Sequence, residues 1–173
     1  MKKLISLLII AIIALTSSIN ANAWTDRNTF NLKGPVKAVI GSNNYDEYLN
    51  FYENGIIIYE EDPDLYWATI ERDNKGRIIY MSRVNYDYNS KGQVKETSCM
   101  AAGYEQIKYT YNTKGLVIKE ISFSKDFADS PKHTTTTTTY TYQKIDKYGN
   151  WTKRTAKNKY GKEVQTRTIT YYE

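Results

Sequence analysis

Apolar and polar side chains alternate with a period of two along much of the chain. Residues 84–88 read Val-Asn-Tyr-Asp-Tyr, residues 107–111 read Ile-Lys-Tyr-Thr-Tyr, and residues 139–143 read Thr-Tyr-Thr-Tyr-Gln. This alternation is typical of β-strands that have one apolar face and one polar face. Beyond residue 23 we find no sustained apolar period of 3.6 residues, so the pattern predicts strands and not helices.

A tetrapeptide of the form Asx-x-x-Gly separates many of these stretches. An Asx side chain accepts backbone hydrogen bonds at the start of a type I turn, and a glycine at the fourth position adopts the left-handed conformation. Such a turn joins two strands of a hairpin. The frame ends at six of the nine glycines: Gly34, Gly76, Gly92, Gly115, Gly149 and Gly161.

These glycines are therefore predicted to be structural. Gly92→Ala and Gly115→Ala should each destabilise the protein by about 1 kcal/mol, because a side chain would enter the left-handed region. Gly103 lies outside the frame, and Gly103→Ala is expected to cost less.

The repeated unit predicts an all-β fold. We expect an antiparallel meander of about ten strands, built from repeated β-hairpins in a curved or rolled sheet, with a two-sheet sandwich as the alternative. The predicted strands are 36–41, 47–53, 56–60, 65–72, 77–88, 93–100, 104–111, 116–124, 134–145, 150–156 and 162–172.

The chain contains 17 tyrosines, and their rings can either pack against one another or contact a ligand. The alternation places Tyr86 and Tyr109 on the apolar faces of their strands, so we expect both in the core. Tyr111 and Trp151 lie nearer to turns. We predict that these two rings are partly exposed and that they are the candidate ligand-binding residues.

The N-terminus has the three parts of a secretory signal peptide. Lys2 and Lys3 precede the apolar stretch 4–15, and small residues at Ala21 and Ala23 fit a cleavage site. We predict a signal peptide at 1–23 and a single β-repeat domain at 24–173 that begins at Trp24. The apolar stretch is short for a membrane span, although an uncleaved anchor is the alternative. The protein should be exported, and be periplasmic, associated with the outer surface, or secreted, with no membrane span after cleavage.

Charge and reactive residues restrict the function classes. The net charge is +5, but basic and acidic residues are interspersed, so nucleic-acid binding is not predicted. A single cysteine, Cys99, excludes an internal disulfide, and a single histidine, His133, excludes a metal site built on several histidines. Glycosidases use a pair of carboxylates, and the candidates for such a pair are in one acidic cluster: Glu60, Glu61, Asp62 and Asp64.

Three segments resemble a known repeat: "YDYNSKGQVKE" at 86–96, "YTYNTKGLVIKE" at 109–120 and "DKYGNWTKR" at 146–154. They are similar to the YD repeats of Rhs-type exported bacterial proteins. The chain looks like a short, degenerate, stand-alone member, similar to small envelope proteins of Bacteroidetes. Its glycine spacing is irregular, and the strict Gly-Arg-hydrophobic form occurs only at Gly76-Arg77-Ile78. The resemblance implies strand repeats in a coiled sheet and implies no catalytic residues.

These observations favour a non-enzymatic, exported binding or interaction module of the bacterial cell envelope, without a cofactor or a metal. Its partner would be an unknown envelope protein or a glycan. The first alternative is a carbohydrate-binding module that uses exposed Tyr and Trp rings. The second alternative, from another class, is a hydrolase that uses the carboxylates of the acidic cluster.

Overall fold

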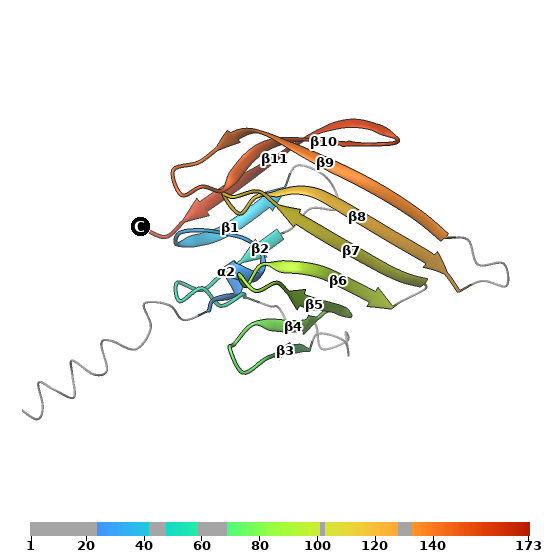
Figure 1. The fold of residues 1–173 in the computed structure, drawn as a ribbon. Coiled ribbons are helices and arrows are strands. Elements are labelled where there is room, and N and C mark those ends of the chain that lie inside the picture. The colour runs from blue at the N-terminus through green and yellow to red at the C-terminus, as the bar shows by residue number, and fades with distance from the viewer. Residues whose placement is uncertain (1–23, 42–47, 59–68, 101–102, 128–132) are drawn as a thin grey trace, which may run out of the picture.

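A computed structural model describes residues 24–41, 48–58, 69–100, 103–127 and 133–173. The predicted signal peptide, including Ala23, and the acidic cluster at 60–64 lie outside the described residues. Figure 1 shows a single curved antiparallel sheet with one short helix, α2 (Asp26–Thr29). The described strands are β1 (Val36–Gly41), β2 (Tyr48–Asn50), β3 (Ile70–Arg72), β4 (Ile78–Met81), β5 (Val84–Tyr88), β6 (Val94–Met100), β7 (Gly103–Tyr111), β8 (Val117–Asp126), β9 (His133–Ile145), β10 (Trp151–Asn158) and β11 (Gly161–Tyr171).

The prediction of an all-β antiparallel meander is confirmed. Strands β3 to β11 are neighbours in chain order, and the order of the sheet is β2-β1-β11-β10-β9-β8-β7-β6-β5-β4-β3. The N-terminal strand β1 therefore pairs with the C-terminal strand β11, and β2 and β3 form the two edges. The pairing of β1 with β11 depends on contacts between segments far apart in the chain, which alternation within single strands does not specify.

The predicted strand at 77–88 is wrong in one respect, because the structure divides it into β4 and β5. Ser82 and Arg83 connect the two strands, and both have positive φ, 49° and 67°. A two-residue hairpin turn needs this conformation and usually takes Gly or Asn there. Neither residue type is present at these positions, so the sequence carries no turn signal.

The short predicted strands near the N-terminus also differ from the structure. In place of 47–53 the sheet contains β2, and the described part of 65–72 forms only β3. The described part of 56–60 contains an isolated bridge between Phe51 and Ile57 and no longer pairing. The tight turn at Gly55, which has a φ of 86°, brings these two residues together.

Four of the Asx-x-x-Gly frames form the same hairpin turn. In each, the Asx Oδ1 atom accepts hydrogen bonds from the amides two and four residues later, at 2.9–3.0 Å. The glycine amide also donates to the Asx carbonyl, and each glycine has a φ between 79° and 90°. The frames are those that end at Gly76, Gly92, Gly115 and Gly149.

The other two frames differ. Asn158 is directly paired with Gly161, so only two residues form that connection, and Oδ1 of Asn158 accepts from the amide of Tyr160 alone among the turn amides. Asn31 instead donates from its side-chain amide to the carbonyl of Gly115 at 2.8 Å, and no hairpin forms at Gly34. The residues of both segments fit the frame, but the segment at Asn31 makes a long-range side-chain hydrogen bond and the segment at Asn158 forms a shorter connection.

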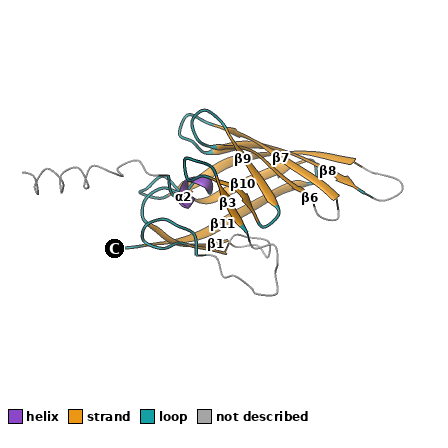
Figure 2. Cartoon of the chain, turned by 90° about the horizontal axis from the view of Figure 1, so that it is seen from below, coloured by secondary structure: helices purple, strands orange, loops and turns teal. Residues whose placement is uncertain are grey.

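The segment 24–35, which contains α2, lies across the end of the sheet where these turns gather (Figure 2). The side-chain amide of Asn31 reaches the turn at Gly115, and Lys33 exchanges two backbone hydrogen bonds with the side chain of Asn150 at 2.9 and 2.8 Å. Trp24 packs edge-on against Tyr88 with a ring separation of 5.7 Å. The N-terminal segment thus connects hairpins that are distant in sequence.

The apolar core lies on the inner, concave face of the sheet, beneath this segment. It joins residues of β1 to residues of β4, which are each next to an edge strand, so the two edge regions of the curled sheet meet there. Partly buried side chains from β5 and β11 complete the cluster. Its buried members are Leu32, Val36, Val39, Phe51, Ile57, Ile78 and Met81.

The turn glycines provide a matched test of backbone strain against packing. Gly76 and Gly92 have the same φ of 79°, but a Cβ at Gly76 would meet no atom within 4 Å, whereas one at Gly92 would lie 2.9 Å from the Trp24 ring. We expect Gly76→Ala to cost about 1 kcal/mol through strain alone, and Gly92→Ala to cost more. Urea unfolding of both variants measures the difference, and equal losses would contradict it.

The surroundings of Gly103 contradict the expectation that Gly103→Ala costs less stability than substitution of the turn glycines. A Cβ there would lie 2.7 Å from the backbone oxygen of Lys125 on the adjacent strand β8. Because a backbone atom cannot rotate away, Gly103→Ala should not be the mild substitution that its position outside the frame suggested.

Candidate functional site

A pocket of about 280 Å³ opens on the inner face, between the sheet and the segment that contains α2. Strands β5 to β11 supply most of its wall, and Thr29, Phe30 and Asn31 supply the rest. The remaining lining residues are Val84, Tyr86, Val94, Thr97, Tyr109, Tyr111, Val117, Glu120, Tyr142, Trp151, Arg154 and Arg167.

Period-two alternation places the tyrosine rings on this face. Their hydroxyl groups are directed toward the protein itself: Tyr111 donates to the carbonyl of Val94 at 2.6 Å, and Tyr142 donates to the carbonyl of Val117. Burial raises the pKa of Tyr111 and of Tyr142 above the ordinary value. Both phenols are therefore neutral at physiological pH, and the rings form a fixed wall.

Glu120 is a carboxylate in this wall. Tyr140, on the next strand, donates its hydroxyl hydrogen to Glu120 at 2.5 Å. Burial, and then the neighbouring carboxylate, raise the pKa of Tyr140. The proton therefore stays on the phenol, and Glu120 contributes the negative charge of the pair.

Trp151 lies against two arginines at the other side of the pocket. The guanidinium carbons of Arg154 and Arg167 are each 4.1 Å from the centroid of the Trp151 ring, a cation–π distance. Arg167 donates from Nε to the Trp151 carbonyl at 2.7 Å, and Arg154 donates from Nε to Oε1 of Gln165 at 2.7 Å. These bonds fix both guanidinium planes before any ligand arrives.

The charges of the lining are unequal. Arg154 and Arg167 contribute two positive charges, and Glu120 contributes one negative charge. Arg154 also lies 4.0 Å from the centroid of the Tyr140 ring. The arginine side of the pocket is therefore suited to an anionic group, and the tyrosine side is suited to an apolar or hydroxylated body.

The two predicted ligand-binding residues, Tyr111 and Trp151, both line this pocket. The expected contrast between core and partly exposed rings does not appear, because Tyr86, Tyr109, Tyr111 and Trp151 are all half-buried. The curl of the sheet explains this, since rings near the turns are covered by the N-terminal segment.

Sequence reasoning missed the two arginines and Glu120. Arg154 lies three residues after Trp151 on β10, whereas Arg167 lies on β11 and reaches Trp151 only through the pairing of the two strands. The alternation at 139–143 did place Tyr140 and Tyr142 on one face, which is the available signal for this region. His133 lies on the opposite, outer face beside Phe123, with ring centroids 6.2 Å apart.

Comparison with known proteins gave no match to a family model, to a curated protein or to a solved structure. Within the described residues, no helix is long and apolar enough to cross a membrane. In the same part of the chain, no group of three or more His, Cys, Asp and Glu side chains could hold a metal ion.

Proposed function

We propose that this protein is a non-enzymatic, exported binding module of the bacterial cell envelope, and that it holds a compact organic acid in the inner-face pocket. The observation that carries the proposal is the pair of guanidiniums fixed on Trp151 at the wall of a pocket of about 280 Å³. Ligand pockets begin near roughly 300 Å³, so the ligand is small. Export rests on the N-terminal signal pattern and on the resemblance to YD repeats.

The carbohydrate-binding alternative has less support from this geometry. Sugar stacking needs an open aromatic face, but Trp151 is half-buried and its ring carries two guanidiniums. Tyr111 is likewise half-buried, and its hydroxyl is bonded to the backbone. An acidic sugar whose carboxylate meets Arg154 would fit both proposals.

The binding proposal is tested with small carboxylates of defined shape. Benzoate, shikimate and galacturonate are added to the purified protein, and the melting temperature is recorded. A ligand at about ten times its Kd adds about 1.4 kcal/mol to stability, which corresponds to several degrees. We expect at least one of the three to produce this shift in the unmodified protein and none to do so in Arg154→Gln.

Lys153→Gln is the matched control, because Lys153 is the preceding residue of the same strand and points to the opposite face. It removes one positive charge without changing the pocket, so the shift should be retained. Loss of the shift in both variants would indicate general charge attraction. No shift with any of the three acids in the unmodified protein would contradict the proposed ligand class.

A further inference from the structure

Among the described residues, the charged side chains on the outer face of β7–β11, opposite the pocket, are all basic. Strand pairing places Lys162, Lys157, Thr139, Lys119 and Thr110 directly beside one another across five strands. Neighbouring strands are about 4.8 Å apart, so this row extends about 19 Å. It forms a straight track of ammonium and hydroxyl groups on the sheet.

The rest of the outer face has the same composition. Among the described outer-face positions of these five strands, none is Asp or Glu, and nine are threonines. Carboxylates of the outer face lie beyond these five strands: Glu96 on β6 is 3.8 Å from Lys108, and Asp87 on β5 is directly paired with Glu96. The lysines that strand pairing places on the outer face are Lys108, Lys119, Lys125, Lys144, Lys153, Lys157 and Lys162.

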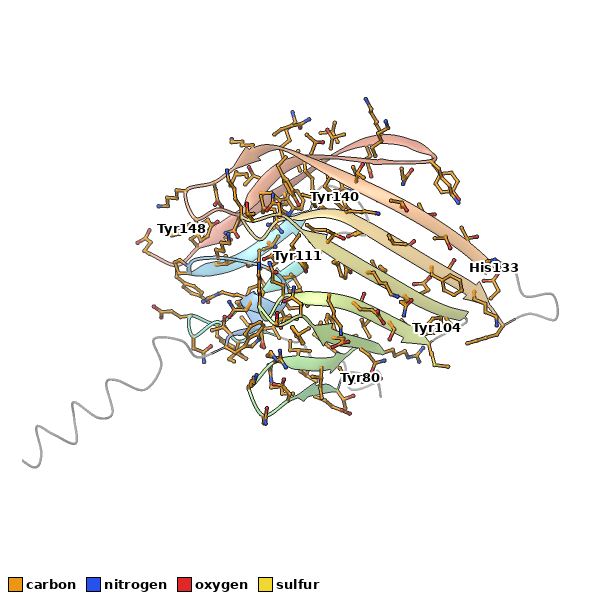
Figure 3. All side chains as sticks on the ribbon, in the orientation of Figure 1. Tyr80, Tyr104, Tyr111, His133, Tyr140 and Tyr148 are labelled. Atoms are coloured by element: carbon orange, nitrogen blue, oxygen red, sulfur yellow. The ribbon has the colours of Figure 1, made fainter. Side chains whose placement is uncertain are left out.

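We propose that this outer face binds an anionic polysaccharide. The lysine ammonium groups would meet carboxylate or sulfate groups of the polymer, and the threonine hydroxyls would hydrogen-bond its hydroxyl groups. A row of three rings near the far end, Tyr104, Phe123 and His133, adds a surface for sugar rings, with successive centroids 6.2 Å apart. Figure 3 shows Tyr104 and His133 at the end of the sheet far from α2.

The composition of this face favours a dissolved polymer over an anionic membrane. Binding to a lipid surface is strengthened by apolar side chains that enter the acyl region. On β7–β11, the exposed large apolar side chains on or next to the outer-face row are Val164, at 53%, and Ile118, at 38%, and they lie on separate strands. Charge and hydroxyl groups therefore dominate, which matches a hydrated, hydroxyl-rich polyanion.

The test compares two variants that each lose three positive charges. Lys119→Gln/Lys157→Gln/Lys162→Gln removes the track, whereas Lys75→Gln/Lys91→Gln/Lys114→Gln removes the lysines at the third position of three hairpin turns. Binding of polygalacturonate and of dextran sulfate is measured by biolayer interferometry, with neutral dextran as the blank. We expect the track variant to bind at least one polyanion on the order of a hundredfold more weakly, about fivefold for each lysine, and the turn variant to bind nearly as the unmodified protein does.

Circular dichroism of both variants shows whether the fold is intact, and ionic strength tests the electrostatic origin. At about 1 M salt the Debye length falls to about 3 Å, so binding should be largely lost. Equal weakening in the two variants, or no binding of either polyanion, would overturn the proposal. So would tighter binding to duplex DNA or to phosphatidylglycerol vesicles than to both polysaccharides.

Discussion

Replacing Asp26 by alanine is expected to lower the free energy of unfolding by about 3–5 kcal/mol, the usual cost of breaking a buried ion pair. The Asp26 side chain is fully buried, at 0% exposure, and forms an ion pair with Arg72 of the edge strand β3. Its carboxylate also accepts the amide hydrogen of Ile57 at 2.8 Å. Removing it leaves a guanidinium and an amide without their partner, and loosens the segment that covers the turns.

The control is Asp87→Ala. Asp87 is paired with Lys95 at 2.8 Å, but its side chain is 62% exposed, so water screens the pair and compensates its loss. Urea unfolding of both variants should show a loss of at most about 1 kcal/mol for Asp87→Ala. Similar losses at the two sites would mean that the N-terminal segment does not hold the two edge regions of the sheet together.

Local chemistry explains which parts of the fold the sequence could predict. The four hairpin turns at Gly76, Gly92, Gly115 and Gly149 are specified within five residues, because Asx Oδ1 accepts two nearby amides and glycine takes positive φ. Alternation then specified the strands on either side. The connection at Ser82 has neither signal, so it was missed, although both of its residues have positive φ.

The position of segment 24–35 could not be predicted in this way. Its contacts join residues far apart in the chain: Asn31 with Gly115, and Lys33 with Asn150. A single sequence gives no register for such pairs, and the asparagine at position 31 is also a plausible turn residue. The same limit applies to the pocket, where Trp151 meets Arg167 only because β10 pairs with β11.

The tyrosines of the inner face both pack against the sheet and line the proposed binding pocket. Substituting one of them therefore tests whether this face is packed as described. Tyr111→Ala is expected to cost about 3 kcal/mol or more, because it removes a half-buried ring from the wall of the inner-face pocket and enlarges the cavity there. Tyr160→Ala is the control, since the Tyr160 side chain is 75% exposed at a hairpin end. Its loss should be within about 0.5 kcal/mol.

Tyr111→Phe separates the ring from the hydroxyl group. It keeps the packed ring and removes only the hydrogen bond to the carbonyl of Val94, so the loss should be about 1 kcal/mol. Because this hydroxyl is bonded to the backbone, Tyr111→Phe should also retain any carboxylate binding that depends on Arg154. Thermal unfolding of the three variants, with and without the bound acid, measures both effects. An unchanged melting temperature for Tyr111→Ala would mean that this face of the sheet is not packed, and the curled arrangement around segment 24–35 would be wrong.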